Sequence, residues 1–87
     1  MIYLICRNRV ADFDAWKKVF DSHAAAQRDA GLHVKHLWRS IDNIQDVIML
    51  FEVHDLTKAR AFVTSPKVPD AKRQSGVIGE PEMYFVR

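Results

Sequence analysis

An unbroken apolar run, VIMLF at residues 47–51, constrains the fold of this chain more than any other feature. The run continues with Val53 after Glu52. A strand that is apolar on both of its faces needs cover on both sides. In a chain of 87 residues the helices can cover one face of a small sheet, and the other face stays bare. The run therefore predicts a second copy of the chain as the other cover, that is, a homodimer through the sheet face.

The composition is that of one ordinary globular domain over residues 1–87, with 48% hydrophobic and 28% charged residues. Thirteen Lys and Arg residues against eleven Asp and Glu leave a net charge of +2, spread along the chain. A net charge this small and this evenly spread does not favour electrostatic binding to nucleic acid or to anionic lipid. We therefore expect no nucleic-acid partner and no membrane partner, and a small-molecule ligand or a protein partner instead.

The single cysteine, Cys6, excludes a disulfide framework and a multi-cysteine zinc site. Cys6 lies in a predicted strand and is expected to pack as a small apolar core residue. The chain starts without a positive region before its short apolar stretch, and no segment reaches the roughly 20 apolar residues that span a bilayer. Together these features predict a cytoplasmic protein.

Capping and turn signals divide the chain into strands and helices. Asp12 and Asp55 stand where a side chain can accept from the free N–H groups of a first helical turn, and Gly31 stands where a left-handed residue can end a helix. The predicted elements are strands over 2–10, 32–41, 47–53 and 81–87, helices over 13–30 and 56–64, and a long loop over 66–79 with a turn of helix near 70–74.

The order βαββαβ predicts an α+β fold of the ferredoxin-like plan, a four-stranded antiparallel sheet with both helices on one face. In this plan the strands over 2–10 and 47–53 are central, so the apolar run lies where two-sided burial is most needed. An RNA-binding sheet with the same strand order is not expected, because residues 47–53 lack basic residues and glycine.

Five parts of the sequence also carry a family resemblance: VADFDAWKKVFD at 10–21, Gly31, FEVHD at 51–55, AFVTSP at 61–66 and GVIGEP at 76–81. With these residues the chain resembles the antibiotic-biosynthesis-monooxygenase-like group of dimeric α+β-barrel proteins, which includes cyclase-like members. The resemblance covers nearly the whole chain, and it concerns caps, core aromatics and turns more than chemistry.

The resemblance implies that two sheets pack face to face across a two-fold axis, and that each protomer keeps a pocket between its sheet and its helices or loops. The group contains mono-oxygenases, haem-degrading enzymes, isomerases and proteins without a known reaction. The haem-degrading branch uses an Asn on its first strand, which Asn8 matches, together with a Trp and a His. Trp16 and Trp38 do not match clearly, and the predicted second helix has no His. We therefore expect no cofactor.

Two residues are catalytic candidates, Asn8 and His36. Asn8 shares a side of its strand with apolar Leu4 and Cys6, so its amide is predicted to face a partly buried space and to donate to a ligand oxyanion. The alternative is that the side-chain amide of Asn8 forms its hydrogen bonds with nearby backbone groups. His36 lies on the same side of its strand as Trp38, with Val34 and Ser40, and an imidazole beside an indole could clasp a flat ligand and transfer a proton. The alternative is a dimer-rim or solvent contact.

Glu52 and His54 share a face of their strand and, with Trp38, are predicted ligand-binding residues, since a carboxylate can orient an imidazole. The alternative to ligand binding is that Glu52 and His54 pair with each other at the protein surface or at the dimer interface. Arg7 and Arg9 alternate with Asn8 on the other side of the first strand, where they could hold an anion or form ion pairs across the dimer with Glu52 or Glu82. The four histidines lack metal-ligand spacing backed by carboxylates, so no metal site is predicted.

These observations leave two function classes open. The first is a homodimeric enzyme that binds a small, aromatic or enolisable metabolite, as a cofactor-independent mono-oxygenase or a cyclase- or isomerase-like enzyme. The second is a ligand-binding or structural dimer without turnover. No motif in the chain distinguishes between them.

Overall fold

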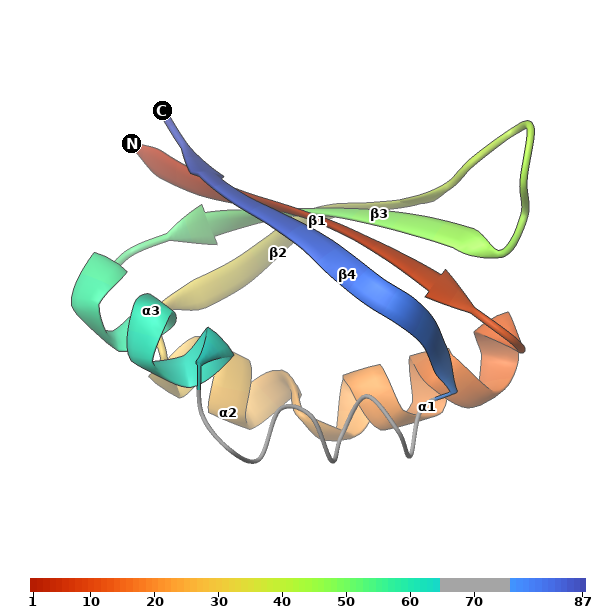
Figure 1. Ribbon diagram of the computed structural model, residues 1–87. Helices are drawn as coiled ribbons and strands as arrows, with labels where there is room; N and C mark the ends of the chain where they lie inside the picture. Colours follow the sequence, from red (N-terminus) through yellow and green to blue (C-terminus); the bar gives the residue numbers. More distant parts are fainter. Residues whose placement is uncertain (65–75) are drawn as a thin grey trace.

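The computed structural model describes residues 1–64 and 76–87 and arranges them as a four-stranded antiparallel sheet with helices on one face (Figure 1). The elements are β1 (Ile2–Val10), α1 (Phe13–Ser22), α2 (Ala24–Asp29), β2 (Leu32–Arg39), β3 (Asp46–Val53), α3 (Leu56–Val63) and β4 (Val77–Val86). The described helices form a single layer, so none of them lies against the opposite face of the sheet (Figure 1). This is the α+β, ferredoxin-like plan that the sequence predicts.

The strands lie in the order β2-β3-β1-β4, so β1 and β3 are central, as predicted. Leu4 of β1 lies opposite Phe51 on β3 and Phe85 on β4. Residues directly opposite each other in an antiparallel pair share a face, so this register fixes which side chains meet. The apolar run at 47–51 is therefore on a central strand.

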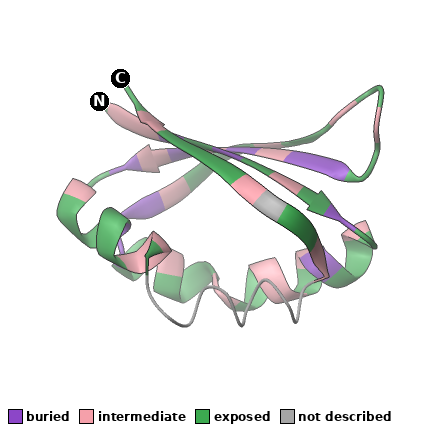
Figure 2. Ribbon diagram, in the orientation of Figure 1, coloured by how far each residue is buried: buried purple, intermediate pink, exposed green. Residues whose placement is uncertain are grey.

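Burial alternates along the two central strands (Figure 2). We call the side toward the helices the helix face; its buried residues on the sheet are Leu4, Cys6, Val10, Leu32, Val47, Met49, Phe51 and Val53. We call the other side the outer face; by register it carries Tyr3, Ile5, Arg7, Arg9, His33, His36, Trp38, Asp46, Ile48, Leu50, Glu52, Glu82, Tyr84 and Val86. Among the residues that the structure describes, therefore, helices cover only one side of the apolar run.

The predicted helix signals are confirmed. Asp12 accepts from the backbone N–H of Asp14 at 2.9 Å, and Asp55 accepts from the N–H of Lys58 at 3.0 Å. Gly31 follows α2 with a φ of 77°, and a Cβ there would lie 2.8 Å from the backbone nitrogen of Asp55. Glycine is thus required at this position both by its backbone conformation and by the closeness of the chain entering α3.

The single helix predicted over 13–30 is wrong, because α1 and α2 are separate helices that meet at His23. The His23 N–H donates to the carbonyl of Phe20, three residues back, at 3.1 Å. The hydroxyl of Ser22 donates to the carbonyl of Val19 at 2.6 Å. Such local bonds replace the regular helical pattern for about one turn.

The last strand begins earlier than the predicted 81–87, because β4 starts at Val77. Residues 77–79, predicted as loop, are therefore strand, and Pro81 lies inside the strand rather than at its start. Proline is tolerated there because β4 is an edge strand and its pairing with β1 shifts register at this point. The rest of the predicted loop, with its helical turn near 70–74, lies outside the described residues.

The hairpin of β2 and β3 is confirmed, although β2 ends at Arg39 rather than at residue 41. In its turn the side chain of Asn43 accepts from the N–H of Gln45 at 3.0 Å. A register shift between Val34 and His36 interrupts the pairing of β2 with β3. This irregularity changes which side chains of β2 share a face.

Candidate functional site

A pocket of about 720 Å³ lies between the helix face of the sheet and the helices. Its lining is mainly apolar. The lining residues are Leu4, Cys6, Asn8, Trp16, Val19, Phe20, His23, Ala26, Gln27, Asp29, Ala30, Leu32, Met49, Phe51, Lys58, Ala61, Phe62, Val63 and Val77. They come from every described strand and helix, so the pocket is a product of the complete fold.

Aromatic rings form one wall of the pocket. The rings of Trp16 and Phe20, one helical turn apart on α1, stack with centroids 4.9 Å apart and planes inclined by 22°. Phe20 also meets Phe51 of β3 at 6.3 Å. Such a wall offers flat apolar surface, which is suited to a planar ligand.

Asn8, His23 and Gln27 are the half-buried polar residues of the lining, whereas Asp29 and Lys58 are exposed. Asn8 comes from the sheet, opposite Val47, and the other two come from the helix layer. The prediction that the Asn8 side chain faces a partly buried space is confirmed. A ligand in the pocket would thus meet polar groups from both layers.

His36 lies on the outer face and not in the pocket. His36 is opposite Leu50 and Trp38 is opposite Ile48, and their rings stack at 4.8 Å with planes inclined by 13°. The prediction that the two rings share a side is confirmed. The prediction that Val34 shares this side is wrong, because the register shift in β2 turns Val34, opposite Phe51, toward the helices.

Glu52 and His54 form the predicted pair, with 3.3 Å between Glu52 Oε1 and His54 Nε2. Lys35 Nζ lies 3.3 Å from the other carboxylate oxygen, and the ring of His33 packs on that of His54. The hydrogen bond from Lys35, followed by that from His54, lowers the pKa of Glu52. Glu52 lies on the outer face, and neither residue of the pair is among the pocket-lining residues.

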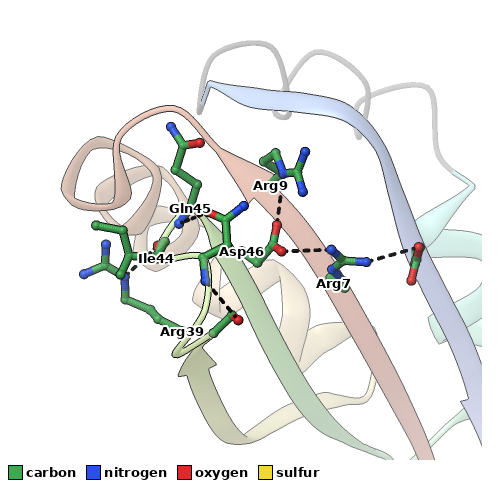
Figure 3. A network of polar contacts seen from close by, with 9 residues as sticks. Arg7, Arg9, Arg39, Ile44, Gln45 and Asp46 are labelled. Atoms are coloured by element: carbon green, nitrogen blue, oxygen red, sulfur yellow. Dashed lines mark hydrogen bonds and ion pairs between the residues drawn. The ribbon is translucent and has the colours of Figure 1, made fainter.

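Asp46 joins the two arginines of β1 on the outer face (Figure 3). Its oxygens accept from Arg7 Nη2 at 2.8 Å and from Arg9 Nε at 3.1 Å. Arg7 also lies 3.5 Å from Glu82 of β4. The hydrogen bonds from Arg7 and then Arg9 lower the pKa of Asp46. The charges of Arg7, Arg9 and Asp46 are therefore paired within one protomer. The contact between Arg7 and Glu82 also lies within one protomer.

Sequence reasoning missed two residues of these sites. His23 lies seven residues after Trp16, which is two helical turns, and this spacing could have placed it on the same face. Asp46 directly precedes the apolar run, and its partners come from a strand 37 and 39 positions away in the sequence. No local pattern would have found that pairing.

Within residues 1–64 and 76–87, no group of three or more His, Cys, Asp or Glu side chains is arranged to hold a metal ion. In the same residues no helix is both long enough and apolar enough to cross a membrane.

No family model matches this chain, and no curated protein matches it either. Solved structures do match this chain. A candidate antibiotic biosynthesis monooxygenase from Bordetella bronchiseptica has a TM-score of 0.76 at 16% identity, over 99% of this chain and 94% of that one. Another from Caulobacter crescentus has a TM-score of 0.70 at 20% identity, over 98% and 86%. A conserved protein from Methanosarcina mazei has a TM-score of 0.72 at 15% identity, over 99% and 90%.

The chain therefore has the fold of the antibiotic-biosynthesis-monooxygenase-like α+β-barrel proteins, as the resemblance in its sequence predicts. At these identities the similarity establishes the fold, and chemistry has to be argued from the residues of the site.

Proposed function

We propose that this protein binds a small, flat, largely apolar metabolite, aromatic or enolisable, in the pocket between sheet and helices. One observation carries the proposal: the pocket of about 720 Å³ has a mainly apolar lining with a few polar groups. Pockets of roughly 300–1,000 Å³ with this character are typical of small-molecule sites. Phe20, which stacks on the buried Trp16, is the half-buried ring of this pair that a flat ligand could contact.

The reaction that this site would support is oxygenation or isomerisation of the bound compound through an enolate or phenolate. Asn8 is the residue proposed to stabilise that anion, because its amide N–H can donate to a developing oxyanion. Asn8 lines the pocket beside the point where β4 shifts register against β1. The names of the structural neighbours from Bordetella and Caulobacter agree with a mono-oxygenase.

We further propose that the whole chain forms one domain of a homodimer through its outer face. The centre of this face is apolar, with Ile5, Ile48, Leu50, Trp38 and Tyr84. The charges toward its ends are largely paired within the protomer, by Asp46 at one end and Glu52 at the other. A face that is apolar at its centre and neutralised at its ends can pack against a copy of itself.

In this dimer the stack of His36 and Trp38 and the pair of Glu52 and His54 lie at the subunit interface. Their predicted roles in catalysis and ligand binding stay predictions, and a ligand in the described pocket lies on the other side of the sheet. The buried thiol of Cys6 suits a reducing compartment, and we propose the cytoplasm.

Ligand-induced thermal stabilisation tests the pocket. A ligand such as 1-naphthol at 100 times its dissociation constant should stabilise the fold by about 2.7 kcal/mol. Ala26→Trp, which fills the lining, should abolish the shift. Ala25→Trp, at a neighbour that is exposed like Ala26 but lies outside the lining, is the matched control and should keep the shift. Equal shifts in both variants would contradict binding at this site.

The role of Asn8 needs a separate test. Asn8→Ala should weaken binding of a phenol about tenfold, because a hydrogen bond to a charged group is lost. Gln45→Ala removes an amide from the exposed turn and should change nothing. Oxygen uptake with enolisable phenols then separates an enzyme from a binding protein: uptake that Asn8→Ala leaves intact would remove Asn8 from the mechanism.

Sedimentation tests the dimer. The wild type should sediment at about twice the chain mass of 10.1 kDa at micromolar concentration. Leu50→Lys on the outer face should give the single-chain mass, since it would bury a charge in an apolar interface. Ile41→Lys, in the exposed turn between β2 and β3, is the control. A wild-type mass near 10.1 kDa would overturn the dimer.

A further inference from the structure

His23 stands where the helix layer is interrupted, and its side chain lines the pocket. Its backbone has φ −98° and ψ 7°, which lies in the bridge region between helix and strand conformations. Figure 1 shows α1 and α2 running beneath the sheet, and His23, at the break between them, is one of the pocket-lining residues.

The imidazole of His23 is half-buried, and within the described residues it has no hydrogen-bond or ion-pair partner. The other histidines have ring contacts: His33 packs on His54, and His36 stacks on Trp38. The ring nitrogens of His23 are therefore available to a ligand. His23 differs from His33, His36 and His54 in that it lines the pocket.

The remaining titratable groups that line the described pocket are Cys6 on β1, Asp29 on α2 and Lys58 on α3. Asp29 and Lys58 are exposed, whereas Cys6 is buried in the core. Imidazole is the side chain best suited to accept and release a proton near neutral pH. His23 is thus the group in this lining with both the position and the chemistry for proton transfer.

We propose that His23 is the proton acceptor of the pocket and that its ligands carry an acidic hydroxyl, as phenols and enols do. The ligand O–H bond breaks, a ring nitrogen of His23 gains the proton, and the electron pair stays on the ligand oxygen. The ligand is then held as an oxyanion between the imidazolium on the helix layer and the Asn8 amide on the sheet. This inference rests on the proposed binding function and deepens it, because it names the group that takes the proton of the ligand.

The test uses 4-nitrophenol, because its neutral and ionised forms absorb at different wavelengths. Bound to the wild type, its ionisation constant should rise about tenfold or more, since a cation within a few ångströms favours the anion. His23→Gln should bind the probe but lose this rise. His33→Gln, a half-buried histidine on the outer face, is the matched control and should behave as the wild type.

A second probe and a second measurement make the result independent of how the variant folds. 4-Nitroanisole has no acidic proton, so it should bind the wild type and His23→Gln equally. In the wild type, ¹⁵N NMR of the His23 ring should change from neutral imidazole to imidazolium when 4-nitrophenol is added, and should not change with 4-nitroanisole.

The outcomes separate the inference from the function on which it rests. Binding of both probes without a rise in ionisation, or a His23 ring that stays neutral, would overturn the role of His23 and leave the pocket standing. Failure of both probes to stabilise or bind the wild type would overturn the proposed pocket function and this inference with it.

Discussion

The two faces of the sheet carry similar residues but have different surroundings. On β1, Leu4 on the helix face is 1% exposed, whereas its neighbour Ile5 on the outer face is 38% exposed. On β3, Val47 and Met49 are buried, and Ile48 between them is half-buried. The described residues of the protomer thus cover the apolar run on its helix face, and a second cover on the outer face stays a prediction.

The comparison separates two properties of the protein. Residues of the helix face form the core and line the pocket, so changes there should alter stability and ligand binding. Residues of the outer face have none of the described helices against them, so changes there should alter the proposed association. The sheet is the boundary between the proposed binding site and the proposed interface.

The largest expected effect comes from Leu4→Ala. Removing this side chain from the core should lower the free energy of unfolding by about 2–5 kcal/mol, since the lost apolar burial leaves a cavity. Ile5→Ala, one residue further on, should cost clearly less in folding and should instead weaken the proposed dimer. Urea unfolding and sedimentation of both variants measure the two effects.

Equal losses of folding stability in Leu4→Ala and Ile5→Ala would remove the distinction between the faces. A monomeric Leu4→Ala beside a fully dimeric Ile5→Ala would reverse it.

A smaller effect is expected from Asp46→Asn, which removes the charge shared by Arg7 and Arg9. The hydrogen bonds from Arg7 and Arg9 lower the folded-state pKa of Asp46 below its ordinary 3.8, so the unfolded chain binds the proton more readily. The stabilisation is therefore complete above pH 3.8 and is lost as the pH falls through the lowered pKa.

Urea unfolding of wild type and Asp46→Asn should thus differ at pH 7 and converge in strong acid. Asp42→Asn, an exposed aspartate in the turn, serves as the control. A difference between wild type and Asp46→Asn that is the same at both pH values would show that the charge of Asp46 is not what stabilises this end of the sheet.

The smallest effect is expected from Glu52→Gln at the other end of the outer face. The carboxylate pairs with Lys35 and His54, whose side chains are about half exposed, and such pairs contribute little to stability. Raising the salt to 1 M should erase the difference from wild type, because the screening length falls to about 3 Å. If the difference survives 1 M salt, the pair is buried in the dimer more deeply than in the protomer.

Much of the fold could be predicted from local chemistry. Capping by Asp12 and Asp55, the turn at Asn43 and the left-handed Gly31 depend on residues close in sequence, so their patterns are readable. The central place of residues 47–51 followed from the element order and from burial. The inward direction of Asn8 followed from simple alternation along β1, which has a regular register with β3.

The incorrect predictions share a physical cause, namely irregularity in the backbone. The break at His23 follows from hydrogen bonds that compete with the helix, and no proline or glycine marks it. The register shift between Val34 and His36 reverses the alternation along β2 and so separates two residues predicted to share a face. Alternation rules fail wherever one extra residue enters a strand.

By itself, the sequence determined the element order, the helix caps and the central place of the apolar run, because these depend on residue type, short spacing and the order of the elements. Tertiary structure alone decided that Asn8 and His23 line one pocket, that His36 lies on the opposite side of the sheet, and that Asp46 reaches Arg7 and Arg9. Those relations join residues distant in the chain, and only strand register and layer packing bring them together.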